Sequence, residues 1–154
     1  TPLHEGFMPA QCLYRMYEVK YNIDLSGNPF LLTYYHPEEN LAVKAFIRRL
    51  RANGHRVVAG SNTFESHWNY LKNMNPSPMD GFDVLYASHE MHMQKNDTVF
   101  FEYIVKKEGF DIQDTFFFDD TLSNVEAACN LGINGFNYRL NNAELEKFLE
   151  PYIK

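Results

Sequence analysis

The segment Thr115–Asn124, TFFFDDTLSN, constrains the fold of this chain more than any other. Its first four residues form a short apolar run that fits a strand buried on both faces, although periodicity alone leaves a buried helix open. Asp119 and Asp120 follow this run directly. In an open parallel sheet, the carboxyl ends of the strands border the crevice in which ligands bind. The segment therefore predicts a buried strand that delivers two carboxylates to such a crevice.

Adjacent carboxylates at the end of a strand need a partner. Two such groups repel each other unless a cation lies between them or one of them is neutralised. A hard, oxygen-preferring ion such as Mg²⁺ is the simplest partner for Asp119 and Asp120. The alternative is that both aspartates only cap the helix expected to begin near Leu122. The segment by itself leaves both interpretations open.

Length and composition point to one ordinary domain. The chain has 154 residues, of which 45% are hydrophobic, and a formal net charge of −6. These values argue against a disordered chain and against a general nucleic-acid binder. Cys12 and Cys129 give neither a disulfide framework nor a metal-ligand spacing, and no signal peptide or transmembrane stretch is visible. We therefore expect a cytoplasmic protein with no nucleic-acid or membrane partner.

Strand-like and helix-like segments alternate along most of the chain. Strands are expected at 55–60, 82–87, 115–118 and 133–138, and helices begin near Pro37, after Thr63, at Asp97, at Leu122 and at Asn141. This alternation implies a parallel sheet with right-handed crossovers and helices on both faces, which is a doubly wound, Rossmann-like α/β fold. The run Phe30–Tyr35, FLLTYY, fits either a strand or part of a buried helix.

Two further polar groups are expected at the same edge of this sheet as the acidic pair. Ser61 and Asn62 follow one strand and precede a helix, where unpaired backbone N–H groups favour an anion, although simple N-capping of the helix by Ser61 or Thr63 explains this motif about as well. Lys95 lies just before the next helix, whose N-cap is Asp97, and is able to reach the crevice from there. Taken alone, it would more often be a solvated surface lysine.

Taken in order, these groups resemble the motifs of the haloacid dehalogenase (HAD) superfamily of hydrolases. The second motif of that family is a Ser or Thr after an apolar strand, the third is a Lys and the fourth is an acidic pair. The corresponding segments here are VVAGSNT, QKNDTVFFEYIVKKEGF and DTFFFDDTLSNVEAACNLGI. The resemblance runs from about Leu41 to Tyr138 and fits best the phosphatase-like branch with a helical cap. It implies a HAD-like core at 41–154 and a remnant of the cap region at 1–40.

The resemblance also implies roles for the polar residues. Ser61 and Asn62 would hold the oxygens of the phosphoryl group, and Lys95 would neutralise their charge without any structural part of its own. The implied substrate is a small phosphorylated metabolite. Phosphoryl transfer is catalysed mainly by positioning and charge stabilisation, which suits such residues.

The fourth motif is implied to hold a metal. Asp120 would bind Mg²⁺ directly, Asp119 would lie behind it, and Asn124 would brace the loop. Lys95, Asp119 and Asp120 would be the catalytic residues that are present in this sequence.

The family's first motif, hhhhDxDxT, which carries the nucleophilic aspartate, is not found in this sequence. Neither Asp24–Ser26 nor Asp80–Asp83 has the required strand and spacing. In the family the strand of this motif is central and lies between the strands that here end at Ser61 and Asp119. We therefore expect the chain to be the C-terminal part of a truncated phosphatase, inactive as given, with the missing strand supplied by an N-terminal segment or by a second chain.

Two other interpretations stay open. In the first, the chain is a non-catalytic HAD-like module that binds phosphate or a protein partner. A dehalogenase is less well supported, because a lysine and a Mg²⁺-suited acidic pair favour phosphoryl chemistry.

Overall fold

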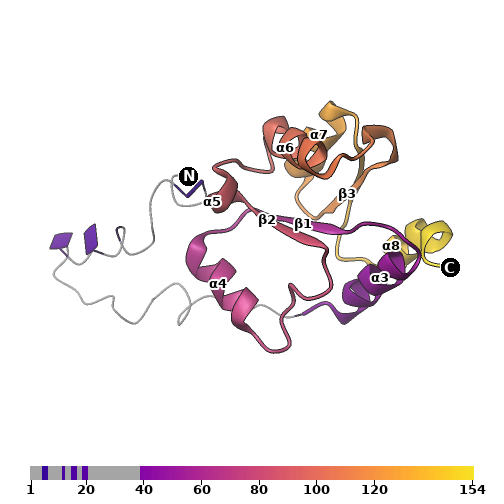
Figure 1. Cartoon of the computed structure of the whole chain (residues 1–154), viewed down its shortest axis with the longest axis horizontal. Coiled ribbons are helices and arrows are strands. Elements are labelled where there is room, and N and C mark those ends of the chain that lie inside the picture. Colours follow the sequence, from indigo (N-terminus) through magenta and orange to yellow (C-terminus); the bar gives the residue numbers. More distant parts are fainter. Residues whose placement is uncertain (1–4, 7–11, 13–14, 17–18, 21–38) are drawn as a thin grey trace.

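The computed structural model describes residues 5–6, 12, 15–16, 19–20 and 39–154 (Figure 1). Most of the expected cap remnant at 1–40 lies outside these residues. The same holds for Phe30–Tyr35, so its assignment as strand or helix stays a prediction, and for the dismissed segment Asp24–Ser26.

Strands and helices alternate through the described core, as the sequence pattern predicts. In chain order, the elements are α3 (Leu41–Ala52), β1 (Val58–Ser61), α4 (Glu65–Asn73), β2 (Val84–Ala87), α5 (Ser88–Met91), α6 (Thr98–Glu108), the 3₁₀ helix η1 (Ile112–Asp114), β3 (Phe116–Asp119), α7 (Leu122–Leu131), β4 (Asn134–Asn137), α8 (Asn142–Leu149) and the 3₁₀ helix η2 (Glu150–Tyr152).

The strands form two parallel pairs. β1 pairs with β2, with Ser61 opposite Ala87, and β3 pairs with β4, with Asp119 opposite Asn137. Within the described residues no ladder joins β1 to β3, so each of these strands has one edge without a strand partner. The doubly wound parallel α/β fold is thus confirmed, and the break between the pairs lies where the missing central strand is expected.

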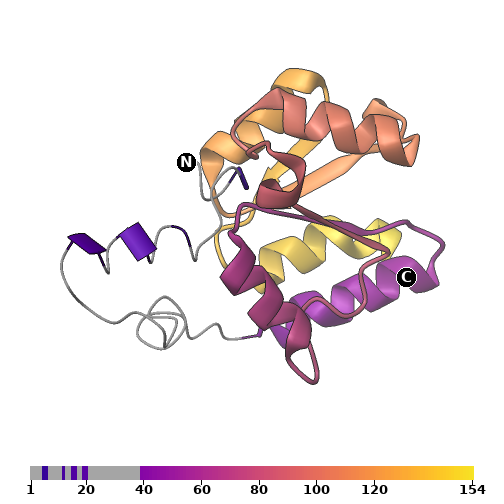
Figure 2. The ribbon, with the colours of Figure 1, turned by 60° about the vertical axis from the view of Figure 1, so that its left-hand side comes forward.

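Helices cover both faces of the strands (Figures 1 and 2). On one face, Phe100, Phe101 and Ile104 of α6 and the alanines of α7 form a buried cluster, against which Phe117 packs. On the other face, α3 and α8 form a second cluster, against which Phe118 packs. Adjacent residues of a strand point to opposite faces, so the apolar run of β3 serves both clusters. The sequence predicts a strand buried on both faces, and β3 is covered on both faces but less completely, because Phe117 and Phe118 are only partly buried and Phe116 is exposed.

Several helix boundaries follow from local capping chemistry. Asp97 accepts a hydrogen bond from the Val99 N–H at 3.2 Å at the start of α6, and Asn141 does the same for Glu144 at 3.1 Å in α8. Gly109 and Gly132 end α6 and α7 with φ of 68° and 103°, values that favour glycine. The helix expected from Pro37 begins only at Leu41, because the N-cap is Asn40, whose side chain accepts from the Val43 N–H.

A buried carboxylate links the amino-terminal side of the sheet to α6. Glu108 is 6% exposed in its side chain, and its Oε2 accepts from the Nε of Arg56 at 2.5 Å. The Tyr86 hydroxyl donates to the other oxygen of Glu108. The Arg56 hydrogen bond lowers the pKa of Glu108, burial opposes this, and the Tyr86 hydrogen bond lowers it further. Burial is the largest cause that raises the pKa of Tyr86 to about 12, and the hydrogen bond to Glu108 is the second.

Asp83, which belongs to the dismissed segment Asp80–Asp83, also has a structural function here. It accepts from the Val57 N–H at 2.8 Å and pairs with Arg51 at 2.8 Å. The Val57 hydrogen bond is the largest cause that holds its pKa below the ordinary value, although burial opposes it. Val57 directly precedes β1 and Asp83 directly precedes β2. Their hydrogen bond therefore lies at the amino ends of these strands, whereas the acidic pair lies at the carboxyl end of β3.

We predict that stability falls on acidification and that Glu108 carries part of this loss. Its depressed pKa means that it stabilises the fold above its unfolded pKa of about 4.3 and that this contribution is lost as pH falls through the folded pKa. Glu108→Gln should cost roughly 2 kcal/mol at pH 7 and flatten the loss between neutral and acid pH. Urea unfolding at several pH values measures both effects. A variant with an unchanged pH dependence would contradict the assignment.

Within the described residues, no helix combines the length and the apolar character needed to cross a membrane.

Candidate active site

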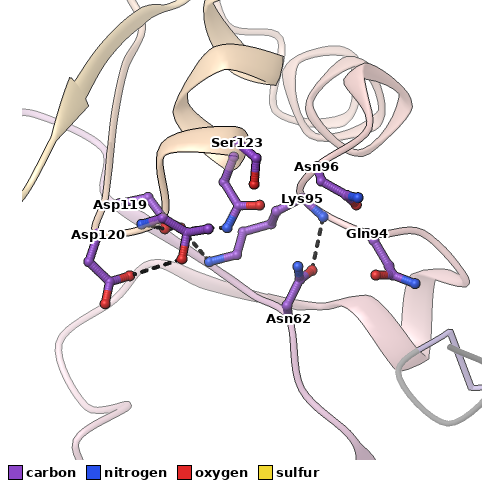
Figure 3. Close-up of a pocket in the computed structure, with 9 residues that line it drawn as sticks. Asn62, Gln94, Lys95, Asn96, Asp119, Asp120 and Ser123 are labelled. Carbon is purple, nitrogen blue, oxygen red and sulfur yellow. Dashed lines mark hydrogen bonds and ion pairs between the residues drawn. The ribbon is translucent and has the colours of Figure 1, made fainter.

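A polar pocket of about 380 Å³ lies at the carboxyl ends of β1 and β3. Asn62 comes from the loop after β1, Lys95 from the loop before α6, and Asp119 and Asp120 from the end of β3 (Figure 3). The pocket is therefore built from both strand pairs and spans the break between them. The structure thus brings together Asn62, Lys95, the acidic pair and Asn124, all of which the sequence singles out.

An ion pair between Lys95 and Asp119 crosses this break. The Nζ of Lys95 lies 2.6 Å from Oδ2 of Asp119, and the two side chains are only 13% and 5% exposed. Figure 3 shows the lysine extended across the pocket toward the end of β3. The sequence-based expectation that Lys95 has no structural part is therefore wrong, because its ammonium group is the charged partner of a buried carboxylate.

Asp119 is held as a carboxylate by several donors at once. Its Oδ1 accepts from the Thr121 N–H at 2.8 Å and from Nδ2 of the buried Asn124 at 3.3 Å. Burial by itself raises the pKa of Asp119, but the hydrogen bond and charge of Lys95, together with these two donors, outweigh it and leave the pKa below its ordinary value. The hydrogen bond that Asn124 donates to Asp119 is consistent with the role implied for Asn124, which is to brace the loop after β3.

Asp120 differs from its neighbour in being exposed to solvent. One of its oxygens is 3.4 Å from the Thr121 hydroxyl. The N-cap residue of α7 is Thr121, and no side chain caps this helix, so neither aspartate acts as the simple helix cap that the sequence leaves open. Asp119 is used internally, whereas Asp120 presents its carboxylate to the pocket.

Two residues at the end of β1, Ser61 and Asn62, differ in whether they line the pocket. Asn62 lines the pocket, and its Oδ1 accepts from the Lys95 N–H at 2.9 Å, which leaves its amide N–H₂ as a donor. Ser61 is the last residue of β1 and is half-buried, but it does not line the pocket. Helix α4 has Phe64 at its N-cap and no capping side chain, so the expected alternative of capping by Ser61 or Thr63 is not observed.

Sequence reasoning missed four residues that line the same pocket: Gln94, Asn96, Thr121 and Ser123. Each is adjacent in sequence to a residue that the motifs identify, and this adjacency is the signal that would have found them. Gln94 also donates to the Glu5 carboxylate at 2.9 Å, which connects the described amino-terminal residues to the edge of the pocket.

The donor set suits a loosely held Mg²⁺ better than a closed metal cage. Within the described part of the chain, no group of three or more His, Cys, Asp or Glu side chains is arranged to hold a metal. Mg²⁺ commonly binds through one or two carboxylates and completes its octahedron with water and phosphate oxygens. The exposed carboxylate of Asp120 fits this mode, and Asp119 stands beside it.

We predict that Lys95→Met destabilises the protein by about 3 kcal/mol, because it leaves Asp119 buried without its cation. The double variant Lys95→Met/Asp119→Asn should recover much of this loss, since both partners are then neutral. Urea unfolding measures each free energy, with Lys106→Met, at an exposed position of α6, as the control. Equal stability of wild type and Lys95→Met would contradict the role of the ion pair.

The fold is shared with solved structures of HAD enzymes. A HAD family enzyme from Bacteroides thetaiotaomicron, solved as a magnesium complex, is 25% identical and superposes with a TM-score of 0.75 over 88% of this chain and 71% of its own. The wild-type complex of that enzyme with magnesium and inorganic phosphate gives a TM-score of 0.77 at 24% identity, with coverage of 88% and 71%. A HAD-like family hydrolase from Porphyromonas gingivalis gives 0.76 at 21% identity, with coverage of 88% and 69%.

Two fungal proteins are similar in sequence over 93 residues, each at 31% identity. One is a drimenol cyclase of Aspergillus calidoustus, for which the match covers 58% of this chain and 17% of the relative. The other is a sesquiterpene phosphatase of Aspergillus oryzae, with coverage of 60% and 47%. The chain therefore spans less than half the length of these relatives. No family model matches the chain.

The fold thus agrees with the resemblance, and the pocket contains Asn62, Lys95 and the acidic pair, whereas Ser61 of the second motif lies outside it. The resemblance to the HAD superfamily is confirmed, and the chain has a HAD-like α/β hydrolase fold.

Proposed function

We propose that this chain is the part of a HAD-type phosphoric monoester hydrolase that binds phosphate and Mg²⁺, and that the whole enzyme acts on a small phosphorylated metabolite. The observation that carries the proposal is the meeting of Asn62, Lys95 and the acidic pair in one pocket at the carboxyl ends of β1 and β3. The magnesium and phosphate complex of the B. thetaiotaomicron enzyme and the sesquiterpene phosphatase relative support this class of reaction.

The charges of the pocket explain why a metal is needed. One lysine and two aspartates line it, which gives a formal charge of −1. The charge of Lys95 is already matched by Asp119, so a phosphate dianion would meet the uncompensated carboxylate of Asp120. Mg²⁺ bound to Asp120 reverses this balance and supplies positive charge next to the phosphoryl oxygens. The finer assignments of Asp120 as a metal ligand and of Asp119 as its support belong to this proposal.

The protein groups then position the phosphoryl group. The amide of Asn62 donates to one phosphoryl oxygen, whereas the role expected for Ser61, which lies outside the pocket, stays a prediction from the sequence. The ammonium of Lys95 has three N–H donors and uses only one on Asp119, so it is able to reach a phosphoryl oxygen while it keeps the ion pair. Preorganised donors of this kind stabilise charge that develops during transfer.

The nucleophile is proposed to come from a strand that inserts between β1 and β3. Among the residues that the structure describes, each of these strands has one edge without a strand partner, and all four residues of β1 are only partly buried. Unpaired backbone groups favour pairing with a further strand. The carboxyl end of a parallel strand at this position would lie at the pocket. An aspartate at that end would bring its side-chain carboxylate next to Asp119. An N-terminal segment or a second chain would supply this strand.

We predict that phosphate binding depends on Mg²⁺. Calorimetry with inorganic phosphate should show binding in the presence of Mg²⁺ and a loss of at least about tenfold in its absence. Asp120→Asn should remove this dependence, because it removes the exposed ligand. Asp114→Asn, which neutralises an exposed aspartate of η1 outside the pocket, is the matched control. Equal Mg²⁺ binding by wild type and Asp120→Asn would refute the assignment.

We also predict that the 154-residue chain is inert toward p-nitrophenyl phosphate. The family's route passes through a covalent aspartyl-phosphate, and water is a weak substitute for that nucleophile. A synthetic peptide with an apolar strand ending in DxD should restore turnover, which the same peptide with NxN should not. Robust turnover by the chain alone, lost in Asp120→Asn, would contradict this view. Phosphate binding with no rescue by the peptide would favour the non-catalytic module instead.

A further inference from the structure

Among the described residues, the most deeply buried polar residue is Ser88, which does not line the pocket. Ser88 is the first residue of α5, follows β2 directly and is 0% exposed. Its Oγ accepts from the Thr63 N–H at 3.0 Å and donates to the Thr63 carbonyl at 3.0 Å. Thr63 is only 7% exposed, so this hydroxyl satisfies two backbone groups that have little access to water. The loop after β1 is therefore fixed to the end of β2 by one side chain.

The backbone of Ser88 anchors the loop that carries Lys95. The Ser88 carbonyl accepts from the Met93 N–H at 3.2 Å and also from the N–H of His92, the C-cap of α5. The left-handed conformation of His92, with a φ of 58°, ends this single-turn helix. Met93 precedes Lys95 by two positions. Ser88 thus holds one loop through its side chain and the other through its carbonyl.

The two loops are joined a second time at the pocket itself. Oδ1 of Asn62 accepts from the Lys95 N–H at 2.9 Å, as Figure 3 shows. Asn62 directly precedes Thr63, the residue that Ser88 holds. The hydrogen bonds therefore form a closed ring, in which Ser88 meets one loop next to Asn62 and the other loop two residues before Lys95.

We propose that Ser88 is a positioning residue of the phosphate site, which acts through Asn62 and Lys95 and touches no ligand itself. This inference rests on the proposed function, in which these two side chains hold phosphoryl oxygens. Donors stabilise developing charge only where supporting contacts hold them in place. Without the hydroxyl, the buried Thr63 backbone groups lose their partner, and the loop after β1 has to shift for them to find another. Asn62 and Lys95 then lose their common alignment.

Ser77 offers a matched control, because it makes the same kind of contact away from the pocket. It is 3% exposed, and its Oγ donates to the Leu71 carbonyl at 2.5 Å and accepts from the Met79 N–H at 3.1 Å. It does not line the pocket. Ser77→Ala and Ser88→Ala therefore remove the same chemical group from two buried sites. We expect both variants to lower the urea midpoint by a similar amount.

Calorimetry with inorganic phosphate and Mg²⁺ on the 154-residue chain separates the two serines. Ser88→Ala should weaken phosphate binding at least about tenfold, whereas Ser77→Ala should stay within about twofold of wild type. Ser88→Cys keeps a weak donor and acceptor, so its affinity should lie between those of wild type and Ser88→Ala. Ser88→Cys also carries the comparison if Ser88→Ala does not fold. All measurements are made well below the unfolding midpoint of each variant, so that unfolded protein does not contribute.

The amide proton of Lys95 reports the alignment of the loops without any ligand. Its hydrogen bond to Asn62 moves its NMR signal downfield, and Asn62→Ala gives the reference position for the loss of this bond. Ser88→Ala should move the Lys95 signal toward that reference, whereas Ser77→Ala should leave it unchanged. A purely structural role of Ser88 would move the signal in neither variant.

The outcomes separate the two proposals. Equal losses of phosphate affinity in Ser88→Ala and Ser77→Ala would overturn the positioning role, because reduced stability would then explain both. Wild-type phosphate affinity in Ser88→Ala would overturn it as well and leave the proposed function standing. Failure of the wild-type chain to bind phosphate with Mg²⁺ would overturn the proposed function, and the Lys95 signal alone would then decide whether Ser88 aligns the two loops.

Discussion

The ion pair between Lys95 and Asp119 is the contact on which the candidate site depends. It joins the loop before α6 to the end of β3 across a break that no strand bridges within the described residues. A buried pair of this kind adds little net stability compared with apolar residues, but it strongly disfavours the loss of either partner. Burial raises the pKa of Asp119, but the hydrogen bond and charge of the lysine help to hold it below its ordinary value, which keeps Asp119 ionised. Asp120 is thereby left as the carboxylate available to a cation.

The break between the strand pairs connects the fold to the chemistry. Parallel sheets in α/β proteins are normally continuous and covered by helices on both faces. Here the helical layers are in place, with α6 and α7 on one face and α3 and α8 on the other, while in the described part of the chain β1 and β3 each keep an edge without a strand partner. The same position would receive both a further strand and the nucleophile at its end. A single structural event would therefore complete the sheet and the active site together.

Much of this arrangement follows from local sequence signals. The start of α7 at Leu122 and the N-cap Asp97 of α6 agree with the sequence-based prediction, because helix capping acts over a few residues. The start of α3 was misplaced because Pro37 is a weaker signal than the hydrogen bond made by Asn40. The contact of Lys95 with Asp119 joins residues 24 positions apart, so no local pattern indicates it. The position of Ser61 outside the pocket depends in the same way on how β1 is oriented.

A crystal structure of the 154-residue chain grown with Mg²⁺ and inorganic phosphate tests the central claim most directly. The account predicts a phosphate ion in hydrogen-bond contact with Nζ of Lys95 and the amide of Asn62, and a Mg²⁺ ion on the carboxylate of Asp120, with the Lys95–Asp119 pair intact. Phosphate bound away from this pocket, or Mg²⁺ coordinated without Asp120, would contradict it.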